Sequence, residues 1–501
     1  MKIVFDNFLG GLSGTDRNAP ANTYAEGREV DPHRDLGYLT PGYIATKVAA
    51  DNDNPQIIKG LIRDICVDPA TDDAYFIDGT NLYHMTDMDG TEAFNNNFDG
   101  SSHYYKAITN ASTSDNCALA IYPISTTNYL FYAYQTASAG DIGRYDLSST
   151  FDDDYMSTVP SGAAALQKAP HPILEYKTYL FIGNGRYIAK FDGQTGANGT
   201  LTAQALDFPQ GWEVTALFPT KNYLGICAWR KQTVGTDIRT NAVIWLWDLV
   251  SSDANQIIPV EDNYISAAIN QDGIVYLIGW GREPGTVIRQ LTDNGGIKLK
   301  SLVHNISGTS YNFQPPTYNS IDVYQNRIIF GTNAPYGEIF SYGRANINEP
   351  YALTMPWGGG GTPASSSAIR AVKTVMRNKV YTGSTDATNY YLNKYYTGGS
   401  TNATYKANYY EPPQKVRINY IVFQFKPLVS GDSVTVSLDT DYGTSNSLGT
   451  ITYSGDGAIT SKRFDCSWIT CRSFRPVIQW SAGAIAFSKI IIDFDYLDLD
   501  I

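Results

Sequence analysis

The densest group of reactive side chains in this sequence lies at residues 31–35, Asp-Pro-His-Arg-Asp. An imidazole flanked by two carboxylates is the kind of set that moves protons in a small catalytic cluster. Neighbouring side chains of an extended segment point to opposite faces, however, so His33, Arg34 and Asp35 should not converge on one substrate. We therefore predict that these charges form ion pairs with the rest of the fold or with a neighbouring subunit.

No other motif in the chain specifies a reaction. The five histidines are scattered singly, without metal-binding spacing, and we expect each to be a surface or strand residue: His33, His84, His103, His171 and His304. Nucleophile elbows and phosphate-binding loops are missing from the sequence, and the glycine-rich stretches 279–285 and 357–363 follow a strand pattern as turns. We accordingly predict no catalytic residue, no cofactor and no metal site.

Two chemical alternatives stay open at this level. The acidic stretches 85–92, 151–155 and 438–445 offer oxygen ligands for Ca²⁺, although none has the spacing of a calcium loop, and solvated turns are the simpler interpretation. The carboxylate pair of a glycosidase comes from distant loops and leaves no local motif.

The role of the tyrosine-rich stretch 389–413 also stays open. It suits a sugar-stacking platform, a protein interface or plain sheet packing.

Composition favours an all-β protein. Of 501 residues only 17% are charged and 13% are aromatic, including 37 tyrosines, and 44 glycines and 23 prolines separate short apolar runs. The net charge of −12 argues against a basic nucleic-acid-binding surface. Without a signal-peptide core or 18 consecutive apolar residues, we expect a soluble protein with no membrane insertion.

The five cysteines show no CxxC pair, and we expect buried free thiols. Cys466 and Cys471 are the one pair close enough in sequence to test for a bond.

A repeat of about 50 residues organises the middle of the chain. Seven β-rich runs begin at residues 74, 129, 179, 223, 274, 327 and 379, so that successive starts differ by 55, 50, 44, 51, 53 and 52 residues. Most are preceded by a strand and a turn and followed by another strand. Three to four strands at this period indicate a β-propeller blade, and seven blades would occupy residues 58–412. The alternative, a pair of β-sandwiches, would space its hairpins more closely.

Both ends of the chain depart from the repeat. Residues 413–501 contain five or six longer strand patterns, which predicts a separate small β-sandwich. Residues 1–57 are polar and carry two plausible strands, 2–5 and 42–48, so we predict an extended arm that packs on the propeller or on a neighbour. Its strand from Tyr43 to Val48 would join the last blade and close the ring.

Three stretches together resemble the structural tail proteins of tailed bacteriophages, in particular the propeller-containing hub or nozzle proteins and minor tail proteins. They are the lead-in DPHRDLGYLTPGYI, the run of blades without Trp-Asp or Asp-box signatures, and the terminal SLDTDYGTSNSLGTITY with FRPVIQWSAGAIAFSKIIIDFDYL. The resemblance transfers no individual functional residue.

The resemblance implies a non-enzymatic virion component, made in the host cytoplasm and located in the tail. Such a protein forms a homo-oligomer, usually of six copies, below the portal and adaptor. It shapes the channel through which DNA passes without specific binding, and it anchors fibres or a plug. Two other functions remain as alternatives: a carbohydrate-binding, receptor-binding propeller and a polysaccharide-degrading enzyme.

Overall fold

The protein is almost entirely β-structure. The computed structural model describes residues 1–13, 22–51, 53, 56–88, 91–112, 116–234, 237–281, 285–292, 296–303, 313–333, 337–344, 348–357, 367–375, 379–386, 388–396 and 399–497, with backbone only for 231–234, 237–239 and 301–303. In this part of the chain the helices are two single turns, α1 (Tyr155–Thr158) and α2 (Tyr453–Asp456). None of the described helices is long and apolar enough to cross a membrane.

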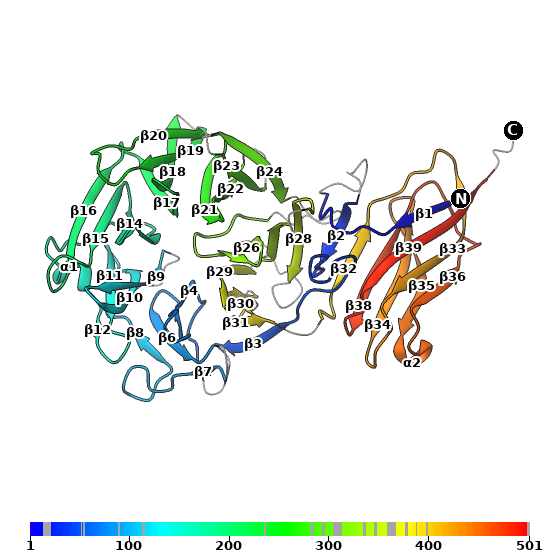
Figure 1. The fold of residues 1–501 in the computed structure, drawn as a ribbon, viewed down its shortest axis with the longest axis horizontal. Coiled ribbons are helices and arrows are strands. Elements are labelled where there is room, and N and C mark those ends of the chain that lie inside the picture. Colours follow the sequence, from blue (N-terminus) through cyan, green and yellow to red (C-terminus); the bar gives the residue numbers. More distant parts are fainter. Residues whose placement is uncertain are drawn as a thin grey trace.

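Seven antiparallel sheets follow one another around the ring seen in Figure 1, counted over the described residues. Blades 1 and 2 comprise β4 (Asp64–Val67), β5 (Ala74–Ile77), β6 (Asn81–Thr86), β7 (Ala93–Phe94) and β8 (Tyr105–Ala107), then β9 (Ala118–Ile124), β10 (Thr127–Gln135), β11 (Gly140–Tyr145) and β12 (Phe151–Asp152). Blades 3 and 4 comprise β13 (Ile173–Tyr176), β14 (Tyr179–Asn184), β15 (Tyr187–Asp192) and β16 (Thr200–Asp207), then β17 (Trp212–Pro219), β18 (Leu224–Val234), β19 (Asp237–Trp247) and β20 (Gln256–Val260).

The remaining blades complete the circle. Blade 5 comprises β21 (Tyr264–Gln271), β22 (Ile274–Trp280), β23 (Thr286–Leu291) and β24 (Ile297–Val303). Blade 6 comprises β25 (Ile321–Tyr324), β26 (Arg327–Gly331), β27 (Ile339–Gly343) and β28 (Ala352–Trp357). Blade 7 comprises β29 (Ala368–Val375), β30 (Lys379–Thr385), β31 (Tyr390–Tyr395) and β3 (Ala45–Ala50).

The β-rich runs of the repeat form the second strand of each blade, and this explains their composition. Successive side chains of a strand point to opposite faces, so Leu180 and Ile182 pack toward blade 2 whereas Phe181 packs toward blade 4. Both faces of these strands are therefore buried, which requires an almost continuous apolar run. The prediction of an all-β propeller is confirmed.

Closure of the ring depends on the amino-terminal arm. β3 pairs antiparallel with β31, from Ala45 opposite Tyr395 to Ala50 opposite Tyr391, and so supplies the outer strand of blade 7. Blades 7 and 1 also share a hydrophobic core, in which Val375 and Tyr381 of blade 7 pack with Phe76 of blade 1. Similar cores lie between every other pair of neighbouring blades among the described residues, which rules out two separate sandwiches as the fold of this region.

The carboxy-terminal region folds as a β-sandwich, at the right in Figure 1. One sheet has the order β1 (Lys2–Phe5), β39 (Phe487–Tyr496), β33 (Val416–Phe425) and β36 (Ser461–Asp465), with β37 (Thr470–Cys471) also on β33. The facing strands are β2 (Tyr24–Arg28), β32 (Thr404–Ala407), β38 (Phe474–Ala482), β34 (Ser433–Thr440) and β35 (Thr444–Thr452).

The sandwich uses more of the chain than the sequence pattern indicates. It begins before the predicted residue 413, because β32 pairs with β38 instead of with a blade. Of the arm's strands, the predicted β1 pairs with β39 of the sandwich, and β2, which was not predicted, pairs with β32. β2 has little strand character in its sequence, YAEGR, and is held in place by its neighbours on both sides.

The propeller and the sandwich share one sheet. β2 lies between β28 of blade 6 and β32, pairing parallel with β28 at Arg28 opposite Met355, so that nine strands run from blade 6 into the sandwich. At this junction, seen between β28 and β32 in Figure 1, the backbone N–H groups of Leu12 and Val30 donate to the carbonyls of Leu353 and Met355 of β28 at 2.8 and 3.2 Å.

Candidate functional site

The charged motif at 31–35 fastens the arm to blade 6. Asp31 and Arg327 of β26 form a two-point ion pair with N–O distances of 2.9 and 3.2 Å, and each side chain is only 2% exposed. Burial alone would raise the pKa of Asp31, but the charge and hydrogen bonds of Arg327 hold it below its usual value. The predicted pairing of this motif with the rest of the fold is confirmed for Asp31.

The other members of the motif point to separate partners. Arg34 donates to the carbonyl of Pro41 at 2.9 Å and lies over the ring of Tyr43, while Asp35 pairs with Lys426 of the sandwich. His33 is buried, and neither of its ring nitrogens has a hydrogen-bond partner. Burial, and then the charge of Arg327, lower the pKa of His33 to about 4, so the imidazole is neutral near pH 7. The motif thus holds the arm against blade 6 through Asp31 and against the sandwich through Asp35.

A pocket of about 530 Å³ opens where the inner strands of blades 2 to 5 begin. It is bounded on one side by residues 313–320, the end of the connection from blade 5 to blade 6. This segment reaches across the ring. Tyr318 donates to the carbonyl of Cys117, the residue before β9 of blade 2, at 2.9 Å, and Thr317 donates to the carbonyl of Arg370 in blade 7 at 3.0 Å. Asn319 contacts the Cys117 carbonyl at 2.6 Å. Residues 313–320, called the channel segment below, thus lie in the centre of the propeller.

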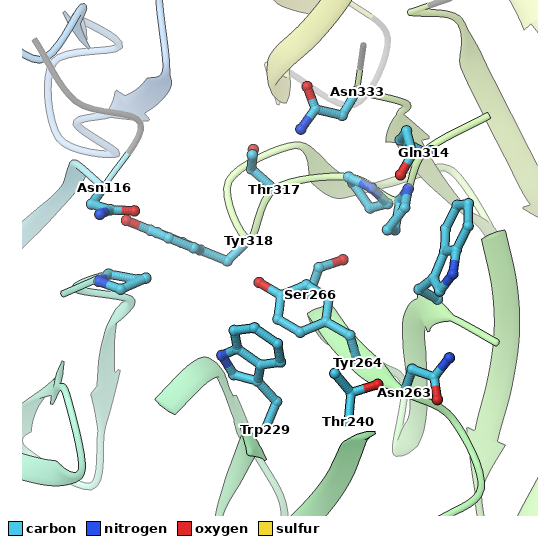
Figure 2. A pocket seen from close by; sticks show the side chains of 14 residues that line it. Asn116, Trp229, Thr240, Asn263, Tyr264, Ser266, Gln314, Thr317, Tyr318 and Asn333 are labelled. Atoms are coloured by element: carbon cyan, nitrogen blue, oxygen red, sulfur yellow. The ribbon is translucent and has the colours of Figure 1, made fainter. Parts of the chain in front are cut away.

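The opposite side of the pocket is aromatic. Trp229 of β18 meets Tyr264 of β21 edge to face, with ring centroids 5.1 Å apart. Trp280 at the end of β22 is directly opposite Tyr264 in the strand register, so the two side chains share one face of blade 5. Figure 2 shows Trp229, Tyr264 and Thr240 facing the channel segment across the cavity.

The remaining lining is polar and uncharged. It combines amide and hydroxyl side chains with prolines: Asn116, Pro170, Thr240, Asn263, Ser266, Gln314, Pro315, Pro316, Thr317, Tyr318 and Asn333. Among the described lining residues there is no charged side chain. Glu213 is directly opposite Trp229 in the strand register and so shares its face of blade 4; burial raises the pKa of Glu213, and a hydrogen bond with Trp229 opposes that rise. Burial, and then the charge of Glu213, raise the pKa of Tyr264 to about 12, so its hydroxyl stays protonated.

Sequence reasoning missed this pocket because its residues come from five blades and share no local motif. The available signal was the QPPTYNS run at 314–320, in which two adjacent prolines fix a loop too long to be a simple turn. Trp280 belongs to the glycine-rich stretch 279–285, whose residues 282–284 lie outside the described part of the chain. Likewise, the stretch 357–363 is described only at Trp357, which is buried.

The acidic stretches bind protein groups in this structure. Asp153 accepts hydrogen bonds from the hydroxyl of Tyr132 at 2.6 Å and the backbone of Thr109 at 2.9 Å. Glu92 pairs with Lys379 and Lys394, and residues 89–90 of that stretch are outside the described residues. In the described part of the chain, no group of three or more His, Cys, Asp or Glu side chains is placed to hold a metal ion.

The described histidines are separated from one another, but two of them are neither the surface nor the strand residues that the sequence predicted. His84 on β6 pairs with Asp73 and the exposed His103 pairs with Asp99, as surface or strand residues should. His33 and His171 are instead buried outside strands, and His171 contacts the carbonyl of Gly183 at 2.7 Å through Nδ1. His304 lies outside the described residues.

The tyrosine-rich stretch 389–413 is in large part sheet packing. Tyr395 and Tyr405 are buried in the cores of the ring and the sandwich, respectively, and Tyr391 donates to Asp386 at 2.7 Å. Tyr390 and Tyr396 remain more exposed, at 36% and 40%. The stretch therefore does not present its tyrosines as one continuous platform.

All five cysteines are free, and four of them are buried: Cys117, Cys227, Cys466 and Cys471. The predicted free thiols are confirmed, and the sequence neighbours Cys466 and Cys471 are not bonded.

Comparisons with known proteins give no family. No family model matches the chain, and no curated protein matches it. Similar solved structures include an exo-β-1,3-galactanase from Phanerochaete chrysosporium (10% identity, TM-score 0.29, covering 67% of this chain and 98% of that one). Others are the Pan2 WD40 domain of Neurospora crassa (8%, 0.42, 71% and 96%) and Drosophila Semaphorin 1a (7%, 0.44, 70% and 88%). At these identities the similarities select no activity.

Proposed function

We propose that this protein is a structural component of a bacteriophage tail, a ring-forming hub or nozzle subunit that anchors other tail parts and does no catalysis. The observation that carries the proposal is the nine-stranded sheet joining blade 6 to the sandwich. Domains joined by ordinary linkers move relative to one another. Here β2 is shared between blade 6 and the sandwich, and Asp31, three residues after β2, is paired with the buried Arg327 of blade 6; together they hold the sandwich on the propeller, as a part that transmits force requires.

The proposal places the DNA path between subunits. The channel segment lies across the propeller axis and bonds to blades 1, 2 and 7, so a duplex has no route through a single ring. A channel enclosed by several copies avoids this obstruction. The net charge of −12 favours a channel wall that repels phosphates and lets DNA slide without specific binding.

Subunit contacts in this proposal use the outer rim of blades 4 and 5. Ile257 on β20 is 62% exposed, Leu299 on β24 is 51% exposed, and Val250 before β20 is 88% exposed. Exposed apolar side chains on outer strands suit a neighbouring copy. Assembly of six copies would close only if the rotation between neighbours matches that number. The adaptor or portal side, fibres or a plug would bind the remaining surfaces.

Two measurements test the proposal. Mass spectrometry of purified particles should find the protein in stoichiometric amount, and mass photometry of the purified chain should find a discrete oligomer. Ile257→Asp should shift that oligomer toward monomer, whereas Val429→Asp, at an equally exposed position (62%) on the sandwich, should not. A protein that stays monomeric and is absent from particles would contradict the proposal.

A further inference from the structure

The pocket beside the channel segment has the chemistry of a carbohydrate site. Trp229, Tyr264 and Trp280 form a connected aromatic wall across blades 4 and 5. The face of an aromatic ring carries partial negative charge, which attracts the C–H bonds of a sugar's apolar face. Opposite this wall, Thr317 and Tyr318 donate to protein carbonyls, but their hydroxyl oxygens can still accept from sugar hydroxyls, and the side-chain amide of Gln314 carries both donors and an acceptor. The cavity volume of about 530 Å³ is that of a small-molecule site.

The charge of the pocket selects among possible ligands. Its described lining residues carry no formal charge, so an acidic or basic ligand would be desolvated there without a partner, at a large cost. The lining also holds no carboxylate in this described set, whereas glycoside hydrolysis needs two flanking the bond. Glu213, beside Trp229 on the same face of blade 4, is a single carboxyl and is not among the described lining residues. The arrangement therefore suits binding without cleavage.

The shape favours a saccharide over a peptide. Peptides dock on exposed sheet edges or in open grooves. This cavity lies at the centre of a closed ring, between strand ends of blades 4 and 5 and a channel segment held by side-chain hydrogen bonds from Thr317, Tyr318 and Asn319. Figure 2 shows the side chains that converge on the cavity from both sides, which leaves room for a compact ligand instead of an extended chain.

We propose that this pocket binds an uncharged saccharide, through stacking on Trp229, Tyr264 and Trp280 and hydrogen bonds to the surrounding amides and hydroxyls. The site is distinct from the tyrosine-rich stretch 389–413. It does not depend on the assembly role proposed above, because all the described lining residues belong to one chain.

Saturation-transfer NMR on the full chain tests this directly, with glucose, galactose, mannose, rhamnose and N-acetylglucosamine as neutral probes. N-acetylneuraminic acid serves as the charged comparison and a proline-rich peptide as the alternative ligand. Trp280→Ala removes part of the aromatic wall, and Thr240→Arg places a long charged side chain on the rim at a half-buried position outside the core. Trp468→Ala, at a 66% exposed tryptophan of the sandwich, is the matched control.

At least one neutral sugar should bind, and both pocket variants should weaken its binding by about tenfold or more, since buried aromatic anchors dominate binding. Trp468→Ala should leave the affinity unchanged. The proposal is overturned if no neutral probe binds at millimolar concentration, or if Thr240→Arg binds as well as the unmodified chain. Preference for the acidic sugar or the peptide would overturn it as well.

Discussion

Replacing Asp31 by asparagine should loosen the arm from blade 6, because Asn keeps the shape of the side chain and removes its charge. Arg327, 2% exposed, would then be a buried cation without a counterion. Breaking a buried pair from one side costs about 3–5 kcal/mol. The backbone hydrogen bonds that should feel this loss are those from Val30 to Met355 and from Gly42 to Glu29, at 3.2 and 2.7 Å.

Native-state hydrogen exchange reports that loss at single amides. A cost of 3–5 kcal/mol corresponds to roughly 100- to 5,000-fold faster exchange through local opening. The matched control is Asp35→Asn in the same motif, whose partner Lys426 is 47% exposed, so that its loss should cost about 1 kcal/mol or less. The double variant Asp31→Asn with Arg327→Met should recover much of the protection, since no charge is then buried. Equal effects of Asp31→Asn and Asp35→Asn would refute the reasoning.

Three further outcomes follow from single sites. The pKa of His33 is about 4 in the fold and 6.5 ordinarily, so as the pH falls the unfolded chain binds the proton first. The free energy of unfolding should therefore drop by up to about 3 kcal/mol between pH 6.5 and pH 4. In His33→Gln the free energy of unfolding should change less with pH over that range. Gly42→Ala should destabilise by about 1–3 kcal/mol in thermal melts, since its Cβ would lie 1.5 Å from a backbone oxygen of β28, whereas Gly443→Ala, with nothing within 4 Å, should not. Thiol titration with and without reductant should give identical counts after denaturation, because Cys466 and Cys471 are free; a reductant-dependent increase would contradict this.

The ring could be predicted from the sequence because every blade contains a strand that is buried on both faces. A second strand buried on both faces must be apolar throughout, as in Ile274–Trp280, and seven such runs at one spacing leave few other folds. The closing strand was predicted from the turn residues before it and the run GYIATKV; the observed β3 is shifted from the predicted Tyr43–Val48 to Ala45–Ala50.

The junction and the pocket could not be predicted in this way. β2 is a strand only because β28 and β32 flank it, and YAEGR alone carries no such signal. The partner of Asp31 lies 296 residues away, so the motif revealed a need for a counterion without identifying it. The pocket residues are individually ordinary strand-end and loop residues, and only ring closure brings Trp229 near Tyr318.

The most direct test of the proposed function is a cryo-electron microscopy map of the phage tail in which we propose that this protein is a subunit. We expect several copies around the tail axis, each with its sandwich in one fixed relation to the propeller through the shared sheet, and with the DNA path between copies. Density for DNA through the centre of a propeller, or sandwiches in variable positions relative to their rings, would contradict it.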